Sequence, residues 1–288
     1  MFPTPSGVRQ GSHLGPLFFN IFINGIFSVV SPCRILLFDD DAKIFFKISK
    51  SDDCLTLQKV LDQFVIWCKT VGLSHNVDKC KVMSFYQTRE MISHNYCLDR
   101  IQLKRVSQVN DLGIVFVPSL DSRPHIDFIV GKALRVLGFI RRNFSNFKSC
   151  NCLVALYSSL VRSTLQYGTL IWSPYTAVDK RRITKVQNRF LGFAGYTLNI
   201  AHPVHDYGPI NEFLNLESLE YRRVKFGKYF IDRLLNGDID ALRLLEQLDI
   251  LVPFNTRFQC QFYLPLSSSN FAKNAPLIKL MREYNDNL

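Results

Sequence analysis

Residues 34–48 read Arg34-Ile35-Leu36-Leu37-Phe38-Asp39-Asp40-Asp41-Ala42-Lys43-Ile44-Phe45-Phe46-Lys47-Ile48. This segment gives the strongest indication of the fold of the first half of the chain. Two β-prone runs, residues 34–38 and 42–48, flank three consecutive aspartates, a pattern that predicts a β-hairpin with carboxylates at its tip. Carboxylates held on a rigid turn can bind divalent ions for two-metal phosphoryl transfer. The alternative interpretation is that the aspartates are ordinary turn residues, because Asp tolerates the backbone angles of turns.

Working outward from the hairpin, the preceding residues predict a glycine-rich loop followed by a helix. Residues 7–16 contain three glycines, and Pro16 suits the first turn of a helix. From Leu17 to Gly25 apolar residues recur every three or four positions, so we expect one face of this helix to pack against a core.

Downstream of the hairpin, residues 57–71 have the spacing of an amphipathic helix, with Asp52 or Asp53 as its cap and Gly72 at its end. Further β-prone runs lie at 81–85 and 107–117. From there on the periodicity is helical. We expect helices over residues 126–142, 152–167, 179–194 and 216–235.

The fold class predicted from these patterns is α+β, and the chain divides into three parts. Residues 1–120 form the α+β part, residues 121–250 a helical part, and residues 251–288 an irregular C-terminal tail.

The composition favours a partner rich in phosphate. The chain has 288 residues, and 35 Lys and Arg against 24 Asp and Glu give a formal net charge of +11. Such a balance suits nucleic acid or an anionic membrane surface. The apolar stretch at 14–38 is interrupted by Pro, Asn and Arg, so we expect no membrane-spanning helix. The eight cysteines form no C-x-x-C pair and no secretory signal is visible, which favours the nucleus or the cytoplasm over secretion.

Three blocks of sequence give the chain a resemblance to a known family. The blocks are Gly7-Val8-Arg9-Gln10-Gly11-Ser12-His13-Leu14-Gly15-Pro16, then Leu36 to Lys43, then Leu73 to Met83. Their order and spacing resemble those of the reverse transcriptases of jockey-like non-LTR retrotransposons. The first block resembles the family's G-V-P-Q-G-S-x-L-G-P loop, the second its Y-A-D-D hairpin, and the third its L-x-L-N-x-x-K-C-x-V-M block. Shorter similarities continue through residues 111–113, 156–163, 171–175 and 219–223.

The resemblance implies an RNA-directed DNA polymerase with a palm at residues 1–120 and a helical thumb-like region at 121–250. It makes Asp40 and Asp41 the catalytic, Mg²⁺-binding carboxylates of the hairpin. It places Gln10 and Gly11 in the pocket for template and incoming nucleotide, with Lys79 near the triphosphate. The implied partners are an RNA template with a DNA primer, or an RNA–DNA duplex, and deoxynucleotide triphosphates. Lys79 alone is equally compatible with a solvated surface lysine.

Several departures from the family pattern predict that this chain is inactive by itself. Arg9 replaces a proline in the glycine-rich loop, and Asp39 adds a third carboxylate beside the catalytic pair. Like charges this close repel one another, which would move a bound metal ion out of position. The family's first catalytic aspartate and its fingers lie upstream of the glycine-rich loop, so we expect the N-terminal half of the polymerase to be a missing partner. We further expect its absence to leave Phe18, Phe19, Phe22, Phe45 and Phe46 exposed.

The helix predicted at residues 179–194 has a basic face. That face consists of Lys180, Arg181, Arg182, Lys185 and Arg189, and apolar residues occupy its back. In a thumb-like region such a face can hold a nucleic-acid backbone. Residues 141, 142 and 148, and the basic cluster at 222–228, would extend it, although each cluster is also typical of a solvated helix surface. Two alternatives to a polymerase segment therefore remain, a non-catalytic nucleic-acid-binding remnant and a decayed mobile-element fragment.

Overall fold

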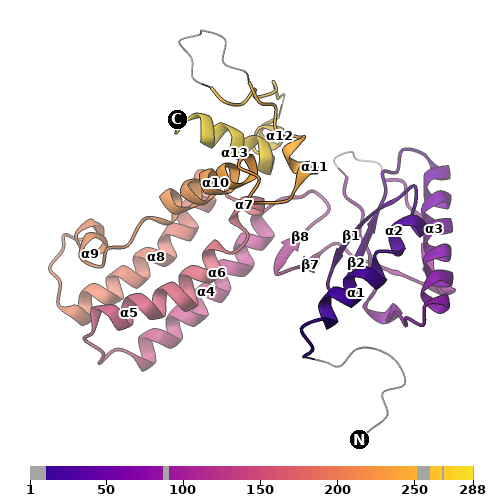
Figure 1. The fold of residues 1–288 in the computed structure, drawn as a ribbon. Coiled ribbons are helices and arrows are strands. Elements are labelled where there is room, and N and C mark those ends of the chain that lie inside the picture. The colour runs from indigo at the N-terminus through magenta and orange to yellow at the C-terminus, as the bar shows by residue number, and fades with distance from the viewer. Residues whose placement is uncertain (1–10, 87–90, 252–259, 268, 288) are drawn as a thin grey trace, which may run out of the picture. The chain divides into compact units, whose positions relative to one another are not determined.

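The computed structural model describes residues 11–86, 91–251, 260–267 and 269–287, and they form two compact units, 1–109 and 110–288. The boundary lies 11 residues before the expected one at 120, inside strand β7 (Val109–Asp111). Figure 1 shows that short strands and a few helices make up the first unit and that helices dominate the second.

The first unit combines helices with short strand pairs. Its elements are α1 (Gly15–Ile23), α2 (Ile26–Val29), β1 (Arg34–Phe38), β2 (Asp41–Phe45), α3 (Ser51–Thr70), a 3-10 turn (Val77–Lys79), β3 (Lys81–Val82), β4 (Cys97–Leu98), β5 (Ile101–Gln102) and β6 (Lys104–Arg105). The mixed helix and small-sheet composition agrees with the predicted α+β class.

The predicted hairpin is confirmed. Strands β1 and β2 pair antiparallel from Arg34 opposite Phe45 to Phe38 opposite Asp41. One face of the hairpin packs on α2 and α3 through a small core that contains Ile35, Ile26 and Val60. Because side chains alternate along a strand, the other face of β1 leaves Leu36 and Phe38 exposed.

The expectation that α1 packs one face against a core is wrong. The helix begins with Pro16 in its first turn as predicted, yet it contains no buried residue. Its half-buried residues, Gly15, Phe19 and Ile23, recur at four-residue spacing on one side, but the helix contributes no residue to either core of this unit. Of the five phenylalanines expected to be exposed, Phe18, Phe22 and Phe45 are exposed, whereas Phe19 and Phe46 are half-buried.

The remaining strands form pairs and no larger sheet among the described residues. The run expected at 81–85 shortens to β3, which pairs in parallel with β6. A parallel pair requires a long crossover, and the antiparallel pair β4–β5 lies within it.

The second unit is mainly helical. It contains β7, β8 (Ile114–Phe116), α4 (Arg123–Asn143), α5 (Cys150–Leu156), a π-helical segment (Tyr157–Arg162), α6 (Ser163–Gln166), α7 (Thr169–Trp172), α8 (Ala177–Leu198), α9 (Gly208–Phe213), α10 (Leu219–Leu235), α11 (Leu242–Leu245), α12 (Asn270–Lys273) and α13 (Pro276–Asn285). The four helices predicted from periodicity are all present.

The main core of the second unit lies between α4, the α5–α6 segment and α8. Tyr157 and Phe190 are fully buried at its centre, and their rings stack with centroids 4.2 Å apart. No helix among the residues described in either unit is long and apolar enough to cross a membrane.

The expected irregular tail is wrong for its last part. Helix α13 begins at Pro276 and packs on α10, with Leu280 and Met281 in a second core beside Ile231 and Leu234. Its apolar residues recur every three or four positions, so the helical signal is present in the sequence.

Candidate functional site

The acidic turn, residues 39–41, lies at the tip of the hairpin in the first unit. Asp39 and Asp40 form the two-residue turn, and Asp41 is the first residue of β2. Asp39 has a φ of 52°, a left-handed conformation that Asp adopts more readily than most residues. All three aspartates are exposed. No group of three or more His, Cys, Asp or Glu that could hold a metal ion occurs among the described residues.

The glycine-rich loop is only partly described. Gln10 and Arg9 lie outside the described residues, so the expected role of Gln10 stays a prediction. Gly11 is exposed and has a φ of 86°, a conformation that L side chains rarely adopt. No heavy atom lies within 4 Å of where a Cβ of this residue would be. Glycine is therefore required here by the backbone rather than by close packing.

Lys79 lies at the end of the 3-10 turn and is exposed. The side chain of Asn76 caps this turn by accepting a hydrogen bond of 3.3 Å from the Lys79 backbone N–H. The structure thus fixes the backbone of Lys79 and leaves its side chain at the surface.

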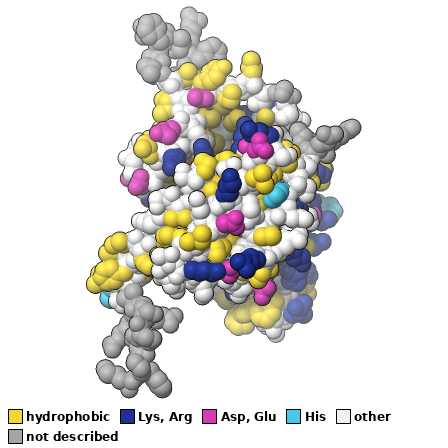
Figure 2. All heavy atoms as spheres, turned by 90° about the vertical axis from the view of Figure 1, so that its right-hand side faces the viewer, with side chains coloured by type: hydrophobic (Ala, Val, Ile, Leu, Met, Phe, Trp, Pro, Cys, Tyr) yellow, Lys and Arg dark blue, Asp and Glu magenta, His cyan; other side chains and the backbone are white. Residues whose placement is uncertain are grey.

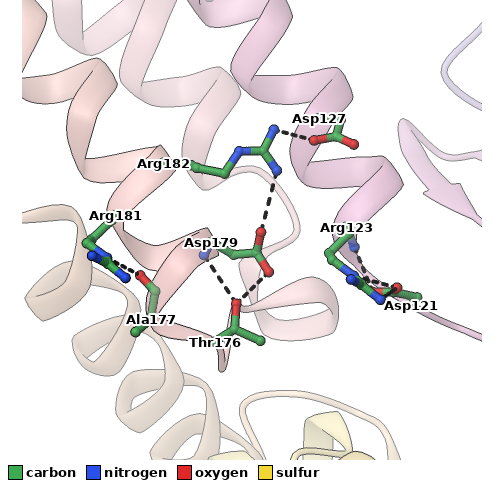
Figure 3. Close-up of polar contacts among 8 residues, drawn as sticks. All are labelled: Asp121, Arg123, Asp127, Thr176, Ala177, Asp179, Arg181 and Arg182. Atoms are coloured by element: carbon green, nitrogen blue, oxygen red, sulfur yellow. Dashed lines mark hydrogen bonds and ion pairs between the residues drawn. The ribbon is translucent and has the colours of Figure 1, made fainter.

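The basic helix α8 begins with a well-formed cap. Thr176 accepts a hydrogen bond from the backbone N–H of Asp179, and its hydroxyl donates to the buried Asp179 carboxylate at 2.6 Å. The same carboxylate lies 3.5 Å from Nη1 of Arg182, whose Nη2 donates to Asp127 on α4 (Figure 3). The bond to Asp127 raises the pKa of Arg182. Arg182 therefore links two helices.

The five basic residues predicted to contact nucleic acid divide into two groups. Lys180 pairs with Glu220 at 2.6 Å and Arg182 pairs with acidic residues, so both are neutralised within the protein. The free basic stripe, defined here as Arg181, Lys185 and Arg189, is exposed, and its members have no ion-pair partner among the described residues. Their spacing of four residues places them along one side of α8. In Figure 3 Arg181 points away from Arg182 and bonds to the Ala177 carbonyl.

The predicted extension of the basic surface onto α10 is wrong for Arg223, which is buried. Arg222 and Lys225 are already paired with an acidic residue of the protein. Arg223 is only 5% exposed, so it cannot contact a nucleic-acid backbone. Arg222 and Lys225 both pair with Glu217, at 2.6 and 2.9 Å, and these bonds lower the pKa of Glu217. The sequence carries a signal for the burial of Arg223, because it shares the four-residue spacing of Leu219 and Gly227 on the core side of α10.

Comparison with known proteins identifies the chain's relatives. Residues 1–140 match the family described as reverse transcriptase (RNA-dependent DNA polymerase). The chain is also 26% identical over 195 residues to a protein described as a probable RNA-directed DNA polymerase from transposon BS of Drosophila melanogaster. That alignment covers 64% of this chain and 22% of the Drosophila protein, so the chain spans about a fifth of its relative. No solved structure matches the chain.

The family match includes the acidic turn, Lys79 and most of α4, which are features that sequence and structure single out independently. Residues 1–140 are therefore similar to the reverse transcriptase family, and the chain is also similar to a transposon RNA-directed DNA polymerase.

Proposed function

We propose that this chain supplies the hairpin half of a reverse transcriptase active site, with Asp40 and Asp41 as the catalytic carboxylates. The observation that carries the proposal is the acidic turn, two adjacent exposed carboxylates on an antiparallel hairpin inside the region matched by the family. In the polymerase, residues 1–109 would correspond to the palm and the helices of the second unit to a thumb.

The donor set of the acidic turn suits Mg²⁺, which prefers hard oxygen ligands and takes one or two carboxylates with the rest of its shell from water and phosphates. Asp40 and Asp41 would hold the ion, which when bound neutralises charge on the reacting phosphates. The hairpin contributes rigidity, because Asp41 is anchored opposite Phe38 in the strand pair. Two carboxylates do not complete a two-metal site, so further ligands are expected from the upstream half of the polymerase.

For the nucleotide pocket we propose that Gln10 and Gly11 shape the site of the template and incoming nucleotide, and that Lys79 neutralises the triphosphate. Glycine permits close approach of the backbone to a base pair, Gln offers both a donor and an acceptor, and a lysine can stabilise the departing pyrophosphate.

The chain alone is expected to have no polymerase activity. A primer-extension assay with an RNA template, a DNA primer, deoxynucleotide triphosphates and Mg²⁺ should give no product above a no-protein control. Extension by the purified chain that disappears in the Asp40→Asn variant would contradict this expectation and show a complete active site.

We propose that the free basic stripe holds the phosphate backbone of the template–primer duplex. Each phosphate contact releases counterions, so the affinity for an RNA–DNA duplex should fall as salt rises. The paired cations, Lys180 and Arg182, should contribute little, because binding a phosphate would require breaking their existing ion pairs.

The test compares two double variants with the same change in charge. Arg181→Gln/Lys185→Gln removes two members of the stripe, and Arg243→Gln/Lys273→Gln removes two exposed cations elsewhere in the second unit. The first variant should reduce the slope of log affinity against log salt by roughly 2, whereas the second should leave it nearly unchanged. Equal slopes in both variants would show that binding is unspecific and would contradict the proposal.

A non-catalytic nucleic-acid-binding remnant is the second candidate. It is favoured by the exposure of the basic stripe. Duplex binding that depends on the stripe, with no response to substitution of Asp40 and Asp41 by Asn in any metal-binding measurement, would support it over the polymerase segment.

A further inference from the structure

A small pocket in the second unit is lined by two buried cations. It lies among α7, α10 and α13, and its free volume of ≈ 10 Å³ is room for about one water-sized sphere. The side chains that line it include Thr169, Ser173, Arg223, Lys279 and Glu283. None of these residues belongs to the acidic turn or to the free basic stripe.

Arg223 enters this pocket without a partner. It is 5% exposed, and both terminal nitrogens of its guanidinium group, Nη1 and Nη2, are buried with no hydrogen-bond acceptor among the described residues. A guanidinium group has donors and no acceptor, so only a ligand that accepts hydrogen bonds can satisfy it. Burial lowers the pKa of Arg223, and the carboxylates of Glu220 and Glu283 partly offset this effect.

Lys279 adds a second positive charge but few free donors. It is 8% exposed, and its Nζ donates to the Ser173 carbonyl at 3.2 Å, the Ser173 hydroxyl at 2.7 Å and the Pro174 carbonyl at 3.1 Å. The three protons of the ammonium group are thus accounted for. Lys279 therefore contributes charge, while Arg223 contributes the open hydrogen-bond donors.

The acidic residues around the pocket do not balance these cations. Glu283 lies 3.6 Å from Lys279 Nζ, and Glu220 is bound to Lys180 at 2.6 Å. Neither carboxylate forms an ion pair of 4 Å or less with Arg223. Among the charged residues that line the pocket, Arg223 and Lys279 against Glu283 leave one uncompensated positive charge.

We propose that this pocket binds a single small anion of halide size, chloride in ordinary buffers, against the guanidinium group of Arg223. The ligand must accept hydrogen bonds, carry one negative charge and occupy little more than the volume of a water molecule. Phosphate groups, nucleotides and carboxylates are too large for that volume. A water molecule would fit and accept hydrogen bonds, but it would leave the positive charge uncompensated.

The first experiment measures the thermal unfolding midpoint of the full chain in sodium chloride and in sodium gluconate at equal ionic strength. A ligand that binds only the folded state raises the midpoint with its concentration, so chloride should raise it by a few degrees relative to gluconate. Arg223→Met should abolish the difference. The control is Arg222→Met, because Arg222 is the neighbouring arginine on α10 and pairs with Glu217 outside this pocket.

A second measurement keeps the proposal falsifiable if Arg223→Met does not fold. Broadening of the ³⁵Cl NMR signal reports chloride exchange on the protein, and Glu283→Gln should increase it because a negative charge beside the anion is removed. Crystals soaked in bromide should show an anomalous peak within hydrogen-bond distance of Arg223. Identical midpoints in both salts with no broadening, or a peak only on the protein surface, would mean that water fills the pocket and would overturn the proposal.

Discussion

The two units of this chain differ in how completely their apolar residues are buried. In the second unit 21 buried residues form one continuous core, including Ile126, Leu165 and Phe190 at 0% exposure. In the first unit α1 contains no fully buried residue, and Leu17, Phe18 and Ile21 on this helix are at least half exposed. On the face drawn in Figure 2, hydrophobic side chains lie scattered among charged ones. The main core of the second unit is thus larger than either core of the first unit, and α1 leaves most of its apolar side chains exposed.

The largest expected difference between the units comes from removing one aromatic ring from each. Phe190→Ala deletes a fully buried ring stacked on Tyr157 and should lower the free energy of unfolding by about 3–5 kcal/mol. Phe18→Ala removes a half-exposed ring and should change it by about 0.5 kcal/mol or less. Urea unfolding followed by circular dichroism measures both. Comparable losses of unfolding free energy in the two variants would mean that α1 is packed against a core. That result would contradict the difference between the two units.

A smaller effect, confined to the second unit, should come from pH. His125 is 1% exposed and its Nδ1 accepts a hydrogen bond of 3.2 Å from the Val115 backbone N–H. Burial lowers its pKa from 6.5 to about 4, so the folded state binds fewer protons than the unfolded state between these values. The stabilisation is complete above pH 6.5 and is lost as pH falls towards 4, by roughly 3 kcal/mol.

The measurement is the free energy of unfolding at several pH values, with His125→Asn as the matched variant, because Asn keeps an acceptor and does not titrate in this range. The variant should lose most of the pH dependence between 6.5 and 4, even if its overall stability is lower. A wild-type curve that is flat over this range would show that His125 is not held neutral by burial.

The smallest expected change in stability comes from replacing exposed apolar residues on α1. The same replacement should clearly reduce the binding of a hydrophobic dye. Leu17→Ser/Ile21→Ser removes two exposed apolar side chains from α1 and should alter stability by about 0.5 kcal/mol or less, while it reduces the fluorescence of a bound hydrophobic dye. Val204→Ser, which changes a single exposed residue of the second unit, is the control. Equal fluorescence in both variants would argue against an apolar face in the first unit.

The sequence predicts those features whose signals are local. The hairpin follows from two β-prone runs around turn residues, and α4, α8 and α10 follow from apolar periodicity. The same reasoning failed for α1, because periodicity indicates which residues could be buried but not whether a partner element covers them. It also failed for the parallel pairing of β3 with β6, which depends on contacts between strands distant in sequence.

The candidate site was predictable to a similar degree. The position of Asp40 and Asp41 on the hairpin follows from the turn itself, whereas the division of the basic residues on α8 does not. Lys180 and Arg182 find their acidic partners on α10 and α4, and no spacing rule within α8 reveals those contacts. The burial of Arg223 could be predicted from its four-residue spacing with Leu219 and Gly227 on the core side of its helix.

The most direct test of the central claim, that the acidic turn is the metal-binding turn of a polymerase, is paramagnetic broadening of backbone amide NMR signals by Mn²⁺, used as a probe for the Mg²⁺ site. In the wild-type chain the broadening should centre on residues 38–42, and Asp40→Asn/Asp41→Asn should weaken Mn²⁺ binding by about tenfold or more. Asp39→Asn is the matched control, since Asn tolerates the left-handed backbone at this position. The Asp39→Asn control should retain the broadening. Broadening that is unaffected by the loss of Asp40 and Asp41 would contradict the assignment of the acidic turn as a metal-binding turn.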